Sequence, residues 1–119
     1  MASPTDVSAA GHEMITLPDA AELLALPINK VHQLIKDGKL VVTRDEQGRR
    51  VLPRIFIAQG GPLKGLPGVI TLLRDGGYTD DEIISWLLRP DDTLPGTPAQ
   101  ALAENRGTEV KRRAQAAAF

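Results

Sequence analysis

Between residues 16 and 57 the chain carries two short helical patterns that a proline separates. The first starts near Leu17, and Pro18 is tolerated there because the first turn of a helix has unpaired N–H groups in any case. Leu26 precedes Pro27 and is therefore biased away from the helical region, which ends this helix. Its expected apolar face comprises Ala20, Ala21, Leu23 and Leu24.

The second helix is predicted from about Ile28 to Asp37. Apolar residues recur in it at the spacing of one inward helical face, and polar residues occupy the opposite face. Gly38 suits the end of this helix, because glycine readily adopts the left-handed conformation found there. The inward residues are Val31, Leu34 and Ile35. Two such helices joined by a tight turn form a helix-turn-helix.

A β-prone and basic stretch follows the second helix. Leu40–Thr43 and Arg50–Leu52 are rich in residues that favour strands, and residues 44–49 between them contain a glycine suited to a turn. This pattern predicts a β-hairpin. Two short helices followed by a hairpin form a winged helix-turn-helix, a unit that commonly places its second helix in the major groove of DNA.

The rest of the chain is predicted to be helical. We expect a flexible tail over residues 1–13, a winged helix-turn-helix domain over residues 14–61 and a helical C-terminal domain over residues 62–119. A short helix is predicted over residues 54–59, and the glycines and prolines of residues 60–68 predict a linker. Further helices are expected over residues 69–73, after Thr79, after Thr97 and from about Thr108. The predicted fold class is mainly α with a small β-hairpin wing.

Composition restricts the classes of function. Of the 119 residues 42% are apolar, which is enough for a core, and the absence of cysteine excludes disulfides and thiolate metal sites. The two histidines, His12 and His32, are far apart, and no spacing matches a catalytic set or a phosphate-binding loop. We therefore expect no metal, no cofactor and no enzymatic activity. No apolar run approaches the roughly 20 residues of a membrane span, and no signal-peptide pattern occurs, so we expect a cytoplasmic protein without membrane contact.

Positive charge is concentrated on the second helix and the hairpin. Residues 30–64 contain eight Lys or Arg and three acidic residues, whereas residues 65–119 contain six and eight. Asn and Gln side chains can pair with adenine edges, and Lys and Arg with guanine or phosphate. The predicted DNA-contacting residues are Asn29, Lys30, His32, Gln33, Lys36, Lys39, Arg44, Arg49, Arg50 and Arg54. The alternative for these residues is an ordinary solvent-exposed polar face.

Two features of the second half have structural explanations. Thr79 and Glu82 have the spacing of a capping box, and the acids Asp80 and Asp81 between them suit the positive end of a helix dipole. Trp86 lies in an apolar helical stripe, which favours a place in the core over a ligand platform. Neither feature indicates a catalytic site.

Several motifs resemble known proteins. Leu17-Pro-Asp-Ala-Ala-Glu-Leu-Leu, Lys36-Asp-Gly-Lys-Leu and Val51-Leu-Pro resemble the excisionase-like and MerR-like winged helix-turn-helix class. The stretch from Leu66 to Ile83, Trp86-Leu and Val110-Lys-Arg-Arg-Ala-Gln-Ala are similar to a family of small actinobacterial DNA-binding proteins, known from mycobacteria as substrates of a membrane Ser/Thr protein kinase. The resemblance implies a winged helix-turn-helix with a helical C-terminal domain, binding to double-stranded DNA, and control by phosphorylation of an N-terminal threonine. Thr5 is the threonine of that tail.

The preferred interpretation is a DNA-binding transcriptional regulator. The alternative is a protein-interaction module, in which the C-terminal helices bind a toxin or a second copy of the chain. Trp86-Leu and Leu94-Pro-Gly-Thr-Pro-Ala-Gln-Ala-Leu resemble helical domains that bind toxins. An exposed apolar patch on the second half would favour this alternative.

Overall fold

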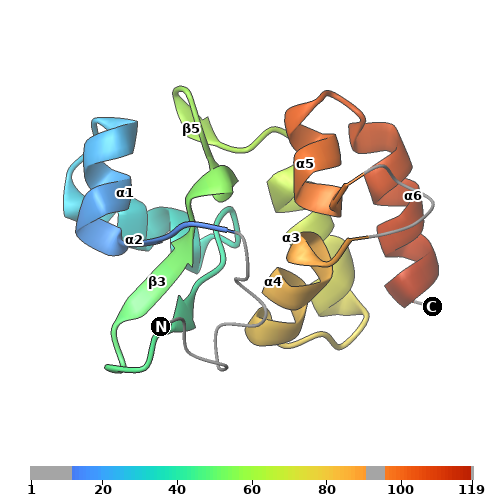
Figure 1. Ribbon diagram of the computed structural model, residues 1–119, viewed down its shortest axis with the longest axis horizontal. Coiled ribbons are helices and arrows are strands. Elements are labelled where there is room, and N and C mark those ends of the chain that lie inside the picture. Colours follow the sequence, from blue (N-terminus) through green and yellow to red (C-terminus); the bar gives the residue numbers. More distant parts are fainter. Residues whose placement is uncertain (1–11, 91–95, 119) are drawn as a thin grey trace.

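The computed structural model describes residues 12–90 and 96–118. Figure 1 shows two parts side by side, a mixed α/β first half and a helical second half. The first half runs β1, α1, α2, β2, β3, the 3-10 helix η2, and the hairpin β4–β5. The second half consists of α3, α4, α5 and α6. This agrees with the predicted class, mainly α with a small β-hairpin wing, in which a winged helix-turn-helix precedes a helical domain.

The two helices of the helix-turn-helix are α1 (Leu17–Leu24) and α2 (Ile28–Lys36), close to the predicted ranges. Thr16 caps α1, because its side chain accepts a hydrogen bond from the N–H of Asp19 while the Asp19 side chain accepts one from the N–H of Thr16. One predicted core position is wrong. Leu23 is 43% exposed, because α1 buries Leu17, Ala20 and Leu24, and Leu23 lies outside that stripe.

A three-stranded antiparallel sheet packs beside these helices, in the order β1 (Met14–Thr16), β3 (Arg50–Pro53), β2 (Thr43–Arg44). Residues 43–53, which form β2, β3 and their turn, are called the wing below. The predicted strand over Leu40–Thr43 is wrong for most of its length. The N–H groups of Lys39 and Leu40 both donate to the carbonyl of Leu34 and so close the end of α2, and strand pairing begins only at Thr43, opposite Val51. The sequence does not predict β1, which pairs Ile15 with Leu52.

The predicted helix over residues 54–59 is also wrong. Arg54–Phe56 forms a single 3-10 turn, η2, and β4 (Ile57–Ala58) then pairs with β5 (Gly61–Pro62). The expected linker over residues 60–68 is therefore a hairpin, followed by α3, which begins at Leu66. Phe56 explains the change, because its fully buried ring anchors the turn and its carbonyl accepts the N–H of Leu63 at 2.8 Å.

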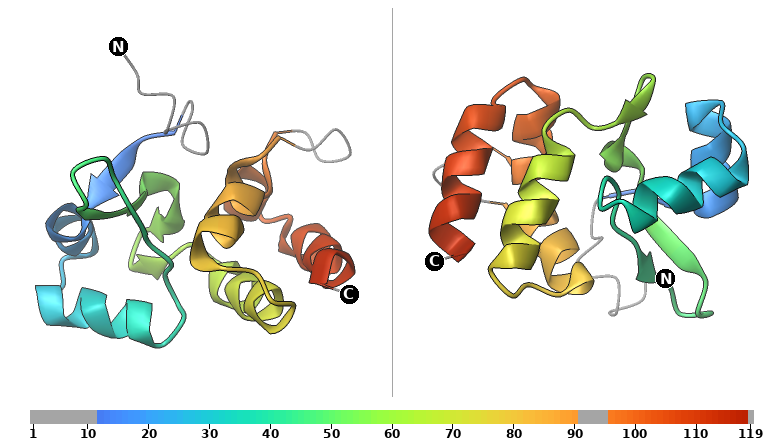
Figure 2. Two further views of the ribbon diagram at one scale, coloured as in Figure 1. Left: turned by 90° about the horizontal axis from the view of Figure 1, so that it is seen from below. Right: turned by 180° about the vertical axis from the view of Figure 1, so that it is seen from behind.

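The second half contains α3 (Leu66–Asp75), α4 (Asp80–Leu88), α5 (Pro98–Ala103) and α6 (Gly107–Ala118). The predicted capping box of Thr79 and Glu82 at the start of α4 is confirmed, and Thr97 and Gln100 form another at the start of α5. Helices α3 and α6 lie side by side in both views of Figure 2. Among the described helices, none has the length and apolar character needed to cross a bilayer.

One buried cluster joins the two halves. It includes Val31, Leu40 and Leu52 from the first half together with Ile70 and Ile84 from the second. Elements of the halves also touch, since η2 contacts α5 and β2 contacts α4. The second half therefore packs directly against the parts of the first half that the sequence assigns to DNA.

Candidate nucleic-acid interface

Helix α2 presents its polar side chains to solvent. Val31 is fully buried and Leu34 and Ile35 are half-buried, so this side of the helix packs inward as predicted. The opposite side is free of such packing. Its exposed residues are Asn29, Lys30, His32, Gln33 and Lys36. A helix held by one apolar stripe and bearing amides and cations on the other side can enter the major groove without unfolding.

One of these side chains already has a partner within the helix. The amide Nε2 of Gln33 donates to Oδ1 of Asp37 at 2.8 Å, an i,i+4 contact. Pairing with adenine uses both the amide nitrogen and the amide oxygen of Gln33. Gln33 must therefore break its hydrogen bond with Asp37 before it can pair fully with a base. Asn29 lies one turn nearer the N-terminus of α2.

The start of α2 holds a residue that the sequence reasoning missed. Ile28 is the first residue of the helix and is 42% exposed, and Leu26 in the preceding turn is 38% exposed. N-terminal residues of a recognition helix are those that contact base edges, and apolar side chains can contact the methyl group of thymine. Ile28 lies at the inward spacing of Val31 and Ile35 (i, i+3, i+7), so spacing alone predicts burial, and the exposure of Ile28 in the first turn of α2 could not be found from the sequence.

The tip of the wing is organised by one carboxylate. Oδ1 of Asp45 accepts the N–H groups of Gln47 at 2.9 Å and Arg49 at 2.8 Å. The backbone closes the same turn, since the N–H of Asp45 donates to the carbonyl of Arg49 and the N–H of Gly48 donates to the carbonyl of Asp45, each at 2.9 Å. Gly48 has φ +79°, a conformation that favours glycine. The turn is therefore a defined structure rather than a loose loop.

Two wing arginines take part in this turn while keeping donors free. Nε of Arg49 pairs with Oδ2 of Asp45 at 2.8 Å, and Nη1 of Arg44 donates to the carbonyl of Gly48 at 2.8 Å. Both residues are exposed. A guanidinium has five N–H donors, so each arginine can hold its wing contact and still offer N–H groups to a phosphate.

The other predicted cations lie at different depths. Arg50 is half-buried and lies directly opposite Arg44 in the register of β2 and β3. The two side chains therefore project from the same face of the sheet. Lys39 is exposed just beyond α2. Arg54, the residue directly after β3, is exposed, and its Nε lies 3.9 Å from Oε1 of Glu13. The fold thus brings Arg44, Arg49 and Arg50 together on the wing.

The contacts in the wing hold the pKa of Asp45 below its usual range. Desolvation, the largest single influence, raises this pKa. The N–H, the guanidinium and the positive charge of Arg49, with the N–H of Gln47, together outweigh it. Each of these groups favours the charged carboxylate, which ties the order of the turn to the ionised form of Asp45.

The conformational order of the wing is expected to depend on pH. Because Asp45 has a lower pKa folded than unfolded, its contacts stabilise the wing at neutral pH, and this is lost as the pH falls through the depressed pKa. In an NMR titration, the amides of Gln47 and Arg49 should keep their chemical shifts from neutral pH down through the ordinary titration range of an Asp carboxyl and change only below that range. Arg49→Ala should shift that transition to higher pH. A wild-type carboxyl of Asp45 that titrates above its usual range would contradict this account.

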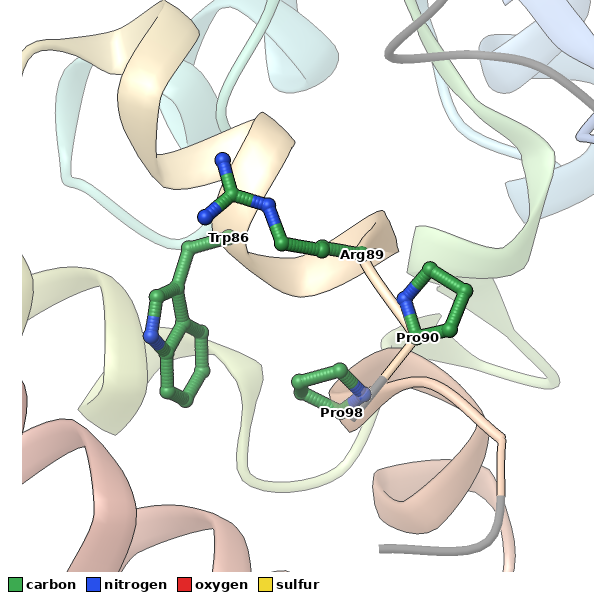
Figure 3. Close-up of a pocket in the computed structure, with 4 residues that line it drawn as sticks. All are labelled: Trp86, Arg89, Pro90 and Pro98. Carbon is green, nitrogen blue, oxygen red and sulfur yellow. The ribbon is translucent and has the colours of Figure 1, made fainter. Parts of the chain in front are cut away.

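The second half carries a small hollow of about 220 Å³ lined by Trp86, Arg89, Pro90 and Pro98 (Figure 3). Trp86 is half-buried and packs against the core, in keeping with the expectation for it. The hollow is smaller than typical ligand pockets, and among its lining side chains Arg89 alone is polar apart from the indole N–H. Among the described residues, no group of His, Cys, Asp or Glu gathers to hold a metal.

Comparisons with known proteins agree with this architecture. Residues 3–57 match the family model described as "DNA-binding protein Rv2175c, wHTH domain", and residues 63–118 match "Rv2175c C-terminal domain of unknown function". The chain is 42% identical to "DNA-binding protein Rv2175c" of Mycobacterium tuberculosis over 116 residues, which cover 87% of this chain and 79% of the relative.

A solved structure shows the same fold. The NMR structure of Rv2175c superposes with a TM-score of 0.82 at 40% identity, covering 91% of this chain and 82% of that one. Both halves of the sequence and the three-dimensional arrangement therefore lead to one family. This chain belongs to the Rv2175c family of DNA-binding proteins, with a winged helix-turn-helix first half and a helical second half.

Proposed function

We propose that this chain is a transcriptional regulator that inserts α2 into the major groove of double-stranded DNA and grips the backbone with its wing. The observation that carries this proposal is the exposed amide and cationic face of α2 beside a structured, arginine-bearing wing. Both elements lie on the side of the molecule away from α5 and α6 (Figure 2). The role is binding rather than catalysis.

The charge distribution supports the proposed orientation. Residues 30–64 carry a formal charge of +5, although the whole chain carries −1. Phosphates attract such a local surplus of Lys and Arg regardless of DNA sequence, and the released counterions make the affinity depend steeply on salt. Lys36, the last residue of α2, and Lys39, three residues further on, add exposed positive charge at the end of this helix.

Sequence recognition is assigned to the N-terminal and central turns of α2. Asn29, Gln33 and Lys36 lie at i, i+4 and i+7, which places them along one line of the exposed face. Ile28 adds an apolar contact that suits a thymine methyl group. A site read by these residues would contain adenine and thymine positions next to a guanine.

The test is selection of bound duplexes from a random pool, carried out at two salt concentrations with the full chain. We expect one sequence motif to be enriched at both salt concentrations. The total amount of bound duplex should fall steeply as the salt concentration rises. A palindromic motif would indicate self-association of two copies on DNA. No retention at about 50 mM salt would reject the proposal, because even non-specific binding should appear there.

The alternative function, a protein-interaction module, predicts a different kind of exposed surface. It expects an exposed apolar patch on the second half, where a toxin or a second copy would bind. Among the described residues, the large apolar side chains that are exposed are Leu23, Leu26 and Ile28, all in the first half. This distribution favours DNA binding over a partner held by the C-terminal helices.

We also propose that phosphorylation of Thr5 by a Ser/Thr protein kinase weakens DNA binding in the cytoplasm. Thr5 lies outside the described residues. A phosphate would add about −1.5 to −2 charges, which oppose the approach of DNA phosphates. The chain phosphorylated at Thr5 should bind a selected duplex less tightly than the unmodified chain, as measured by fluorescence anisotropy. Equal affinities would exclude regulation of DNA binding by phosphorylation of Thr5.

Affiliation with the excisionase-like and MerR-like class stays a prediction.

A further inference from the structure

The first turn of α4 touches the proposed DNA-binding surface directly. Oγ1 of Thr43, at the start of β2, donates to Oδ1 of Asp81 at 2.7 Å. The two residues are 38 positions apart in sequence and belong to different halves of the chain. Capping explains why acids are favoured at the start of α4, but it does not explain this contact with the wing.

The neighbouring acid acts at the end of α2. Oδ1 of Asp80 accepts Nη2 of Arg74 at 2.8 Å and Nε of Arg74 at 3.1 Å. This pair holds the Arg74 guanidinium against Gly38, where an added Cβ would lie 3.2 Å from Nη1. Gly38 comes after Asp37, the residue that caps the end of α2, and has φ +75°. Arg74 therefore places its positive charge at the C-terminal end of α2, where cations are favoured by the helix dipole.

Two consecutive acids thus hold the two elements that would contact DNA. Asp80 acts on the end of α2 through Arg74, and Asp81 acts on the base of the wing through Thr43. We propose that the first turn of α4 is a brace that fixes the wing relative to α2, an inference that rests on the proposed function. The positioning residues are Asp80, Asp81, Arg74 and Thr43, and this assigns a role to the C-terminal domain.

The brace matters because the proposed complex needs two elements to bind at once. Pairing with β1 holds β3, the inner strand of the wing, whereas β2 is the outer strand and pairs with β3 alone, and the segment Leu40–Val42 that joins β2 to α2 is not a strand. A wing that could swing would lose orientational freedom on binding, and that cost would lower the affinity. A wing held in place beforehand avoids it.

Charge-matched variants of Asp81 test the brace. Asp81→Asn and Asp81→Ala both remove one negative charge, which by itself should tighten binding to a polyanion, but Asn retains an oxygen that can accept the Thr43 hydroxyl. We expect Asp81→Ala to bind a selected duplex about three- to tenfold more weakly than Asp81→Asn, with similar thermal stability. Thr43→Val should be weakened relative to Thr43→Ser by a similar factor. Equal affinities within both pairs would overturn the proposal.

Two further measurements separate the contact from general effects. Adding Thr43→Val to Asp81→Ala should cost no further affinity, because the hydrogen bond is already absent. Asp75, an exposed acid at the end of α3, supplies the control, and its Asn and Ala variants should bind alike. Additive losses from Thr43→Val and Asp81→Ala, or an equal Asn-to-Ala difference at Asp75, would contradict a specific contact.

A measurement without DNA keeps the brace distinct from the proposed function. NMR relaxation of the amides of residues 43–50 in the free full-length chain should show greater motion in Asp81→Ala than in Asp81→Asn. Should that difference appear while the wild-type chain binds no duplex, the brace stands and the DNA function fails. Equal motion in both variants would overturn the brace, whatever the affinity for DNA.

Discussion

Replacing Lys36, Arg49 and Arg50 together by alanine is expected to lower the affinity for a selected duplex about a hundred- to a thousandfold at about 50 mM salt. Each cation that neutralises a phosphate releases counterions, so the loss of three contacts should also reduce the slope of log affinity against log salt by about 3. Lys36 and Arg49 are exposed and Arg50 is half-buried, so the fold should persist. Fluorescence anisotropy at several salt concentrations measures both quantities.

A matched triple variant controls for net charge. Arg89, Lys111 and Arg112 are exposed cations of the second half, and their joint replacement by alanine removes the same three charges. This variant should keep most of the affinity and nearly the full salt slope, because exposed charges beyond about 10 Å from the DNA are screened. An equal loss in both triple variants would show that only total charge matters and would reject the assigned surface.

The parts of the fold that the sequence predicts are those encoded within a few residues. Pro27 separates α1 from α2, and the spacing of Val31, Leu34 and Ile35 places the inward side of α2. The pair Thr79 and Glu82 identifies the start of α4, because a capping box is completed within a single turn. Each of these features needs no information from distant residues.

The parts that the sequence does not predict depend on distant pairing. Strand β1 exists because Ile15 finds Leu52 across the sheet, and a three-residue segment has no periodicity from which to infer that partner. Residues 54–62 look like a helix and a linker until the burial of Phe56 fixes a turn and a hairpin. The contact of Thr43 with Asp81 likewise joins two local patterns that are each complete without it.

The candidate site shows the same division. The exposure of the polar face of α2 is predictable from helical spacing, whereas the partners of its side chains depend on rotamers. Gln33 with Asp37 and Asp45 with Arg49 are four residues apart, so their pairing could be anticipated from spacing. The position of Arg74 at the end of α2 could not, because it requires the packing of α3 against the first half.

Replacing Phe56 by alanine is expected to lower the free energy of unfolding by about 3–5 kcal/mol. The ring is fully buried in the cluster that joins the halves, and η2 contacts α5, so truncation removes apolar contacts and leaves a cavity. Urea denaturation measures the loss. Leu23→Ala is the control, because Leu23 is 43% exposed and should cost less than about 1 kcal/mol.

The position of Phe56 makes this variant a test of whether the halves unfold together. Trp86, the one tryptophan of the chain, reports on the second half by fluorescence, whereas circular dichroism reports on helices of both halves. With a shared core, Phe56→Ala should shift both transitions to the same lower urea concentration, because two-state unfolding gives coincident probes. If only the dichroism moved while the Trp86 transition kept its midpoint, the halves would unfold separately, and the second half could not hold α2 and the wing in register.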